Sequence, residues 1–215
     1  MHKNTLLPVV LCVAAGMAHA SPELLRSAET GDLAGVQRQL RSGAAVDTRD
    51  TRQRTPLLLA TWGNHPAVAQ ALIAAGADVN AQDDQQDSPY LVAGAHGRTE
   101  ILKMTLAHGA NLRSTNRYGG TALIPASEKG HPEAVRLLIA AGSDVDFVNN
   151  LGWTSLLEVV ILGQDTAVYQ DITRQLIAAK ANVNLPDKNG VTALQHARQR
   201  GLTQIAALLL QAGAR

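Results

Sequence analysis

The stretch TPLLLATWGNHPAVAQALIAAGADVN, residues 55–80, decides the fold because its parts return along the chain at a fixed interval. Hydroxyl residues equivalent to Thr55 recur at intervals of 33, 33, 33 and 38 residues, at Thr55, Ser88, Thr121, Thr154 and Thr192. A second series recurs at intervals of 33, 33, 33, 38 and 33 residues, at Gly43, Gly76, Gly109, Gly142, Lys180 and Gly213. The two series agree on one period and one insertion, so the chain is built from tandem repeats.

Each repeat predicts a turn, a helix, a second turn and a second helix. Thr55 suits a helix N-cap, and Pro56 suits the first helical position because its missing N–H would have no partner there. Five positions after the hydroxyl, where two helices must approach closely, stand Ala60, Ala93, Ala126 and Ala197. Nine positions after it stand residues that tolerate the left-handed conformation ending a helix: Asn64, Gly97, Gly130, Gly163 and Gly201. The apolar-faced segment 134–139 is typical of the second helix.

These features resemble the ankyrin-repeat family, whose repeat is a β-turn followed by two helices with a Thr-Pro-Leu-His signature. The resemblance covers essentially everything after Ser21. It implies an all-α ankyrin-repeat solenoid of about six helix-turn-helix repeats joined by β-turn fingers. We expect repeats at about 21–48, 49–81, 82–114, 115–147, 148–185 and 186–215. The first and last are expected to be caps with polar outer faces.

The sequence departs from the family pattern in three ways. The signature histidine is replaced by Leu58, Leu91, Ile124, Leu157 and Gln195, so apolar packing is expected in place of the imidazole hydrogen bond. Pro125 falls about one turn into a first helix and predicts a local bend. The extra residues of the fifth repeat, expected between Gly163 and Lys180, should lengthen the loop between its helices or the first turn of its second helix.

The first twenty residues have the layout of a secretory signal peptide. Basic Lys3 precedes an apolar run over residues 6–15, and the small residues Ala18 and Ala20 suit cleavage before Ser21. The run is about half the roughly 20 residues that a membrane-spanning helix needs. We therefore predict a signal peptide at 1–20 and an ankyrin-repeat domain at 21–215.

Cleavage would deliver residues 21–215 to the periplasm or the extracellular space. The alternative is a lipid anchor at Cys12, which is disfavoured because bulky Leu11 precedes it and the apolar run continues past it. Loss of the leader removes the single cysteine, and loss of Lys3 lowers the basic count from 19 to 18, equal to the 18 acidic residues. A formally neutral chain disfavours a nucleic-acid partner. We expect a monomer with no membrane attachment after cleavage.

Enzymatic chemistry is not indicated, because catalysis needs groups that converge on one pocket and none of the familiar catalytic, zinc or phosphate-binding motifs occurs. Aspartates at repeat-equivalent turns, such as Asp83 and Asp187, fit turn stabilisation better than calcium binding. We predict no catalytic, cofactor-binding or metal-binding residues. The alternative is an enzyme or small-ligand binder with a site between repeats, for which His96 with Glu128 is the best-placed pair.

The resemblance implies that a partner protein binds to the turn tips and the exposed faces of the first helices, which line a concave groove. The chain has only two tryptophans, three tyrosines and one phenylalanine, yet three aromatics fall at positions that the family varies. Aromatic residues are enriched in interface hot spots. The predicted partner-binding residues are Trp62, Tyr118, Leu151, Trp153, Ile161, Arg52 and Gln85.

We expect this groove to be centred on Trp153 and Tyr118, with the inserted loop near Tyr169 as an accessory contact. The alternative is that Trp153 and Ile161 fold back onto the neighbouring repeat as core. The expected function is a protein-binding module that acts as an inhibitor or immunity protein of an enzyme, or as a factor that stabilises one. A small-ligand site would instead show a closed pocket, and a purely structural scaffold a polar, evenly charged concave face.

Overall fold

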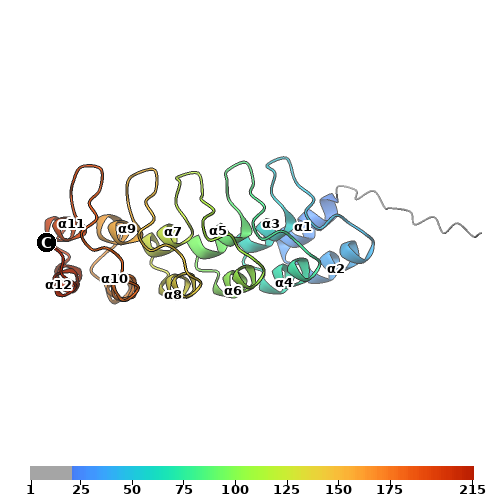
Figure 1. Ribbon diagram of the computed structural model, residues 1–215. Helices are drawn as coiled ribbons and strands as arrows, with labels where there is room; N and C mark the ends of the chain where they lie inside the picture. The colour runs from blue at the N-terminus through green and yellow to red at the C-terminus, as the bar shows by residue number, and fades with distance from the viewer. Residues whose placement is uncertain (1–20) are drawn as a thin grey trace, which may run out of the picture.

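The computed structural model describes residues 21–215, so the predicted signal peptide and Cys12 lie outside the described residues. Over this range the chain is an all-α solenoid in which the odd-numbered helices form one row, the even-numbered helices form a second, and the loops between repeats project as fingers (Figure 1). The helices are α1 (Pro22–Thr30), α2 (Leu33–Arg41), α3 (Pro56–Trp62), α4 (Pro66–Ala74), α5 (Pro89–Ala95), α6 (Thr99–Ala107), α7 (Leu123–Glu128), α8 (Pro132–Ala140), α9 (Ser155–Leu162), α10 (Ala167–Ala178), α11 (Ala193–Gln199) and α12 (Thr203–Gln211). None of these helices is long and apolar enough to cross a bilayer.

The recurring hydroxyl residues cap the odd-numbered helices, as the sequence predicts. Thr55 Oγ1 accepts a hydrogen bond from the backbone N–H of Leu58 at 3.2 Å. The same bond is formed by Ser21, Ser88, Thr154 and Thr192. Each such cap contributes about 1 kcal/mol because it satisfies a helix donor that would otherwise have no partner.

The fourth repeat lacks this cap because of Pro125. In the second repeat the N–H of Leu59 donates to the carbonyl of Thr55 at 3.0 Å, but Pro125, at the equivalent position, has no N–H. Ile124 N donates to the Thr121 carbonyl instead, at 3.2 Å, and Thr121 Oγ1 has no hydrogen-bond partner within residues 21–215. The distortion expected at Pro125 therefore appears at the start of α7, which begins one residue late in its repeat.

Left-handed residues end most of the odd-numbered helices as predicted, with φ of 54° at Asn64, 61° at Gly97, 72° at Gly130 and 69° at Gly201. The prediction was wrong for Gly163, which is extended with φ of −73° and ψ of −169°. A side chain there would still clash, because its Cβ would lie 2.4 Å from the carbonyl oxygen of Val159. Gly163 is thus required for close approach and not for a left-handed turn.

The five additional residues of the fifth repeat are divided between loop and helix. Helix α10 has 12 residues, whereas α4, α6, α8 and α12 have 9 each. Three of the additional residues therefore lengthen the second helix, one lengthens α9, which has 8 residues where α3, α5 and α11 have 7, and one lies in the loop between α9 and α10. This longer path to α10 explains why the chain leaves Gly163 in an extended conformation.

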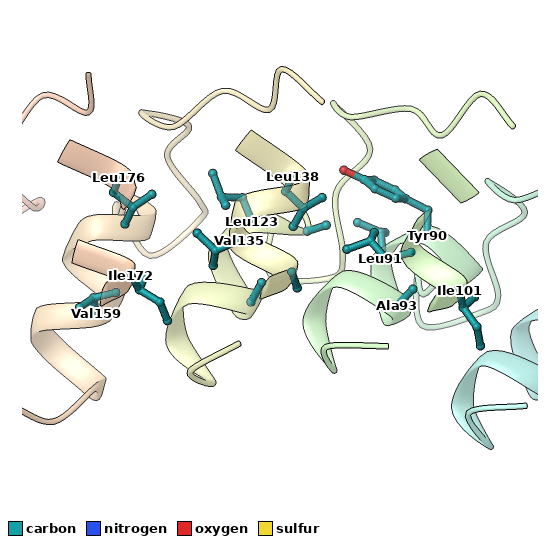
Figure 2. Close-up of a cluster of buried hydrophobic side chains, with 14 of the residues drawn as sticks. Tyr90, Leu91, Ala93, Ile101, Leu123, Val135, Leu138, Val159, Ile172 and Leu176 are labelled. Carbon is teal, nitrogen blue, oxygen red and sulfur yellow. The ribbon is translucent and has the colours of Figure 1, made fainter. Parts of the chain in front are cut away.

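The hydrophobic core runs along the stack between the two rows of helices, where side chains of neighbouring repeats interdigitate (Figure 2). At the position of the signature histidine, Leu58, Leu91, Ile124 and Leu157 are all buried, so apolar packing does replace the imidazole. Gln195 is the exception, because it is exposed and forms a capping box with Thr192. Full burial of one such aliphatic side chain contributes about 1.5–3 kcal/mol.

Neighbouring repeats are also joined by hydrogen bonds at two levels. At the fingers, the N–H of Asp84 donates to the carbonyl of Arg52 at 3.2 Å, and that of Asn150 to the carbonyl of Tyr118 at 3.0 Å. At the turns after the even-numbered helices, an Asp or Asn accepts from a backbone N–H of the next repeat, and we call this series the ladder. Its bonds join Asp47 to Asp78, Asn80 to Asn111, Asp146 to Asn182 and Asn184 to Arg215.

Both kinds of bond are missing where the third repeat meets the fourth. Arg113 occupies the ladder position, and within residues 21–215 no bond joins the carbonyl of Gln85 to the N–H of Arg117. The buried hydroxyl of Tyr90 lies near Ser143 across this junction, yet neither side chain has a hydrogen-bond partner in the described part of the chain. This junction, called the third–fourth junction below, is instead joined by Gln82 Nε2, which donates to the Thr115 carbonyl at 2.8 Å, and by Arg117 Nη1, which lies 3.5 Å from Asp87 Oδ2.

Candidate partner-binding groove

An open groove of about 410 Å³ crosses the row of odd-numbered helices from the second repeat to the fifth. The helices contribute side chains from the ends of α3, α5, α7 and α9, and the fingers contribute side chains from their tips. The residues most important for its character are Trp62, His96, Tyr118, Glu128, Leu151 and Leu162. Its lining comes from four repeats, and it is partly open to solvent and not a closed pocket.

Trp62 lies at one end of the groove, where α3 stops. The side chain is 39% exposed, and its ring makes an edge-to-face contact with the His96 ring, with centroids 4.7 Å apart and planes at 64°. This contact fixes an amphipathic aromatic surface before any partner arrives, which lowers the conformational entropy lost on binding.

Tyr118 lies on the finger of the fourth repeat and is 56% exposed. The Arg117 guanidinium lies 5.0 Å from the centroid of its ring, in cation–π geometry, and also approaches Asp87 Oδ2 at 3.5 Å. Leu151, on the next finger, and Leu162, at the end of α9, are each about half exposed and extend the apolar surface. Tyr118 thus comes from the fourth repeat, between the repeats that supply Trp62 and Leu151 to the groove.

The structure moves the groove away from Trp153. Trp153 and Ile161 are only partly exposed, pack against the hydrophobic core, and do not line the groove. Their folding back onto the core is the alternative that the sequence left open. The prediction of a groove centred on Trp153 and Tyr118 is therefore corrected to one that runs from Trp62 through Tyr118 to Leu151.

Arg52 and Gln85 lie beside this groove and not in it. Both are exposed, and they line a second, polar hollow of about 370 Å³ together with Arg54. The two hollows share Trp62, Asp87 and Arg117 in their walls. A partner that covers Trp62 would thus meet a charged rim on this side, in which arginines alternate with Asp83 and Asp87.

His96 and Glu128, the pair considered for catalysis, both line the groove. Burial and the nearby cations Lys129 and Arg98 lower the pKa of His96 to about 4, so its ring is neutral at ordinary pH. Within residues 21–215 no hydrogen bond joins His96 to Glu128. The open shape and the missing contact give little support to an enzymatic site.

Glu158 is a feature of the groove that sequence reasoning missed. It lies on α9, is 4% exposed, and accepts a hydrogen bond at Oε1 from Asn149 Nδ2 at 2.9 Å. Asn149 itself lines the groove, so Glu158 lies directly beneath the groove wall. A signal was available in the sequence, because Glu158 interrupts the otherwise apolar run SLLEVVIL, residues 155–162.

Tyr169, expected as an accessory contact, supports the groove from within. Its hydroxyl donates to the backbone carbonyl of Glu128 at 2.9 Å, and its ring packs against the core. In the second repeat, His65 Nε2 makes the equivalent contact with the carbonyl of Glu29 at 3.1 Å. The inserted segment therefore supplies a tyrosine where another repeat uses a histidine, and it holds the end of α7 beside the groove.

The fold and the groove define a class of protein: a helical-repeat scaffold that presents an open, aromatic-bearing surface. Among solved structures, the chain is 56% identical to an ankyrin repeat domain from Acinetobacter baumannii, with a TM-score of 0.87 over 89% of this chain and 98% of that one. It is 44% identical to a second ankyrin repeat protein (TM-score 0.85, 88% and 96% covered). It is 28% identical to the ankyrin repeat domain of Bcl-3, a member of the IkappaB protein family (TM-score 0.80, 91% and 87% covered).

The family model for ankyrin repeats, described as three copies, matches residues 24–116, 90–169 and 126–215. The comparison with curated proteins found no match. The chain therefore belongs to the ankyrin-repeat family. Ankyrin repeats are in general protein–protein interaction modules, and the fold is in general a scaffold without enzymatic activity.

Proposed function

We propose that this chain is an exported bacterial ankyrin-repeat protein that binds another protein through the groove. The observation that carries the proposal is the pair of exposed aromatic rings, Trp62 and Tyr118, in a groove open along several repeats. Large aromatic side chains with a polar edge are the residues on which binding energy concentrates at protein interfaces. Burying both rings against a partner would remove their apolar surface from water.

Covering a partner is sufficient for a biological effect, because a bound solenoid excludes other molecules from the surface that it occupies. If this surface contains an active site, the chain acts as an inhibitor or immunity protein. If it contains a weak part of the partner's fold, the chain stabilises the partner, since any ligand that binds only the folded form does so. Neither effect requires catalysis by the chain itself.

Export rests on the sequence of residues 1–20, with its basic start, short apolar run and small residues before Ser21. Expression of the full chain in a bacterial host, followed by fractionation and N-terminal sequencing, tests this part. The expected product begins at Ser21 and is found in the periplasm or the medium. An uncleaved chain that starts at Met1 in the cytoplasm would contradict it.

Binding is tested by capturing partners from the periplasmic fraction and then measuring the affinity of the purified partner. We expect the double variant Trp62→Ala/Tyr118→Ala to bind at least about tenfold more weakly, a loss of about 1.4 kcal/mol or more. Leu210→Ala, which removes an exposed leucine of α12 outside the groove, is the matched control and should bind normally. Wild-type affinity in the folded double variant would exclude the groove as the binding surface.

The second candidate, a small-ligand or enzymatic site at His96 and Glu128, is favoured only by their common place in the groove wall. It predicts that His96→Gln and Glu128→Gln abolish binding or turnover of a small molecule. The open shape of the groove favours the protein partner.

A further inference from the structure

The buried carboxyl of Glu158 is only half satisfied by the protein. Oε1 accepts the Asn149 amide, but Oε2 has no hydrogen-bond partner within residues 21–215 and no measurable contact with solvent. Buried polar atoms without partners are uncommon because each loses its water without compensation. The site therefore lacks a donor.

The equivalent position in the other repeats shows that this arrangement is not needed for folding. The second and third repeats place Leu59 and Val92 there, both buried. The sixth repeat places His196 there, and its Nε2 lies 2.9 Å from Asp187 Oδ2, so an acid meets a ring that can carry a proton. In the fifth repeat the acid, Glu158, lies on helix α9 instead of on the finger, and the finger residue that faces it is Asn149, whose amide carries no charge.

A second carboxylate lies near the first. Burial, and then the negative charge of Glu128 on α7, raise the pKa of Glu158 to about 7, although the Asn149 hydrogen bond opposes them. Within residues 21–215 no cation is among the charges that shift the pKa of Glu158. Arg200 donates to the carbonyls of Val160 and Gly163, Lys188 Nζ donates to the carbonyl of Asn150, and Lys129 lines the groove next to Glu128. A positive charge between the two glutamates would remove their repulsion and supply the missing donor.

We propose that the partner protein inserts a lysine or arginine side chain into the groove beside Leu151, where its cation pairs with Glu128 and, once the Asn149 side chain that covers it moves aside, with Glu158. This inference rests on the proposed function, because it names the chemistry that the same groove recognises. The aliphatic stem of such a side chain would lie along Leu151 and Leu162, which are exposed in the groove. A metal ion fits less well, since no group of three metal-ligating side chains occurs in the described residues.

The probe for the test is a phage-displayed library of random short peptides, selected on the wild-type protein. We expect the enriched peptides to carry lysine or arginine at one fixed position. Replacing this residue with norleucine, which keeps the stem and removes the charge, should weaken binding at least about tenfold. Enriched peptides without a basic position would overturn the proposal.

Two variants and a matched control locate the cation. Glu158→Gln and Glu128→Gln should each weaken the selected peptides at least about tenfold, whereas Glu100→Gln, on the exposed surface of α6, should not. Glu128 is half-exposed, so its variant remains informative even if Glu158→Gln were unstable. Unchanged affinity in both groove variants would overturn the proposal.

The same peptides separate this proposal from the proposed function. If Trp62→Ala/Tyr118→Ala loses the peptides while both glutamine variants keep them, the groove binds protein but does not recognise a basic side chain. If the aromatic double variant binds the peptides as wild type does, the groove is not the binding surface and both proposals fail. An NMR titration gives an independent readout: bound peptide should lower the apparent pKa of Glu158, and an unchanged pKa would contradict the ion pair.

Discussion

Lys180 adopts a backbone conformation that suits glycine. Its φ is 69°, and the equivalent residues Gly76, Gly109, Gly142 and Gly213 have φ between 81° and 92°. In this conformation a residue with a Cβ is strained by about 1–2 kcal/mol relative to glycine. Replacing it with glycine removes this strain, but the greater freedom of glycine in the unfolded chain offsets part of the gain in stability. One position in the second glycine series is thus strained.

We predict that Lys180→Gly raises the free energy of unfolding by about 0.5–1 kcal/mol, measured by urea denaturation. The control is Lys103→Gly on the exposed face of α6, where the same change should lower it by about 1 kcal/mol. A loss of stability in both variants would show that Lys180 is not strained.

Glu158 predicts a pH-dependent stability with a defined sign. Because its pKa is raised from 4.5 to about 7 in the folded protein, the folded state holds its proton longer than the unfolded state. The free energy of unfolding should therefore fall as the pH rises from about 4.5 to about 7, and the loss is complete above this range. Between pH 5 and pH 8 we expect wild type to lose about 2–3 kcal/mol relative to Glu158→Gln.

This comparison is made by urea denaturation of both proteins at the two pH values. Other titrating groups, such as His96, are common to both and cancel. A constant difference between the two proteins across this range would mean that the Glu158 carboxyl is solvated or paired in the folded chain.

Among the structural elements, the ladder offers a direct test of how the repeats are joined. Asn80 and Asn184 each accept a backbone N–H of the next repeat and donate Nδ2 to a glycine carbonyl, at 2.9 and 3.3 Å respectively. Arg113 stands at the equivalent place in the third repeat, and within residues 21–215 the N–H of Asp144 has no such acceptor. The ladder bonds are therefore missing at the third–fourth junction because Arg113 replaces the Asp or Asn of the other repeats.

We predict that Arg113→Asn stabilises the protein by about 1 kcal/mol, because it adds up to two hydrogen bonds at the third–fourth junction. The reverse change, Asn80→Arg, should cost a similar amount. Thermal and urea unfolding measure both effects, and a neutral result for Arg113→Asn combined with a loss for Asn80→Arg would mean that the junction cannot bring the partners within reach.

The elements also show what the sequence could and could not predict. Capping residues and the 33-residue period predicted the helix pairs because they act locally, within one repeat. The extended Gly163 was not predicted because its conformation depends on how the added residues of the fifth repeat are shared between loop and helix. The position of the groove was only partly predicted, since whether Trp153 faces solvent or core depends on packing against a neighbouring repeat.

At the scale of the whole molecule, binding is spread over several repeats. Trp62 and His96 come from the second and third repeats, whereas Tyr118, Glu128 and Leu151 come from the fourth and fifth. In a solenoid each repeat contacts only its neighbours, so the relative position of these two groups depends on a single interface. This interface is the third–fourth junction.

We therefore expect the third–fourth junction to act as a hinge between the first three repeats and the last three. Within residues 21–215 this junction lacks the finger and ladder bonds and is joined by only two side-chain contacts, from Gln82 Nε2 to the Thr115 carbonyl and from Arg117 to Asp87, so we expect the two arms of three repeats to change their mutual angle more easily here than at the other interfaces. We predict that hydrogen–deuterium exchange is faster for the backbone amides at this junction than at the other repeat interfaces, that Arg113→Asn slows it, and that a bound partner slows it further. If the backbone amides exchanged equally slowly at every repeat interface, the solenoid would have no hinge at this junction. Because fewer hydrogen bonds join the repeats at this junction, the width of the groove between Trp62 and Tyr118 would vary with the size of the bound partner.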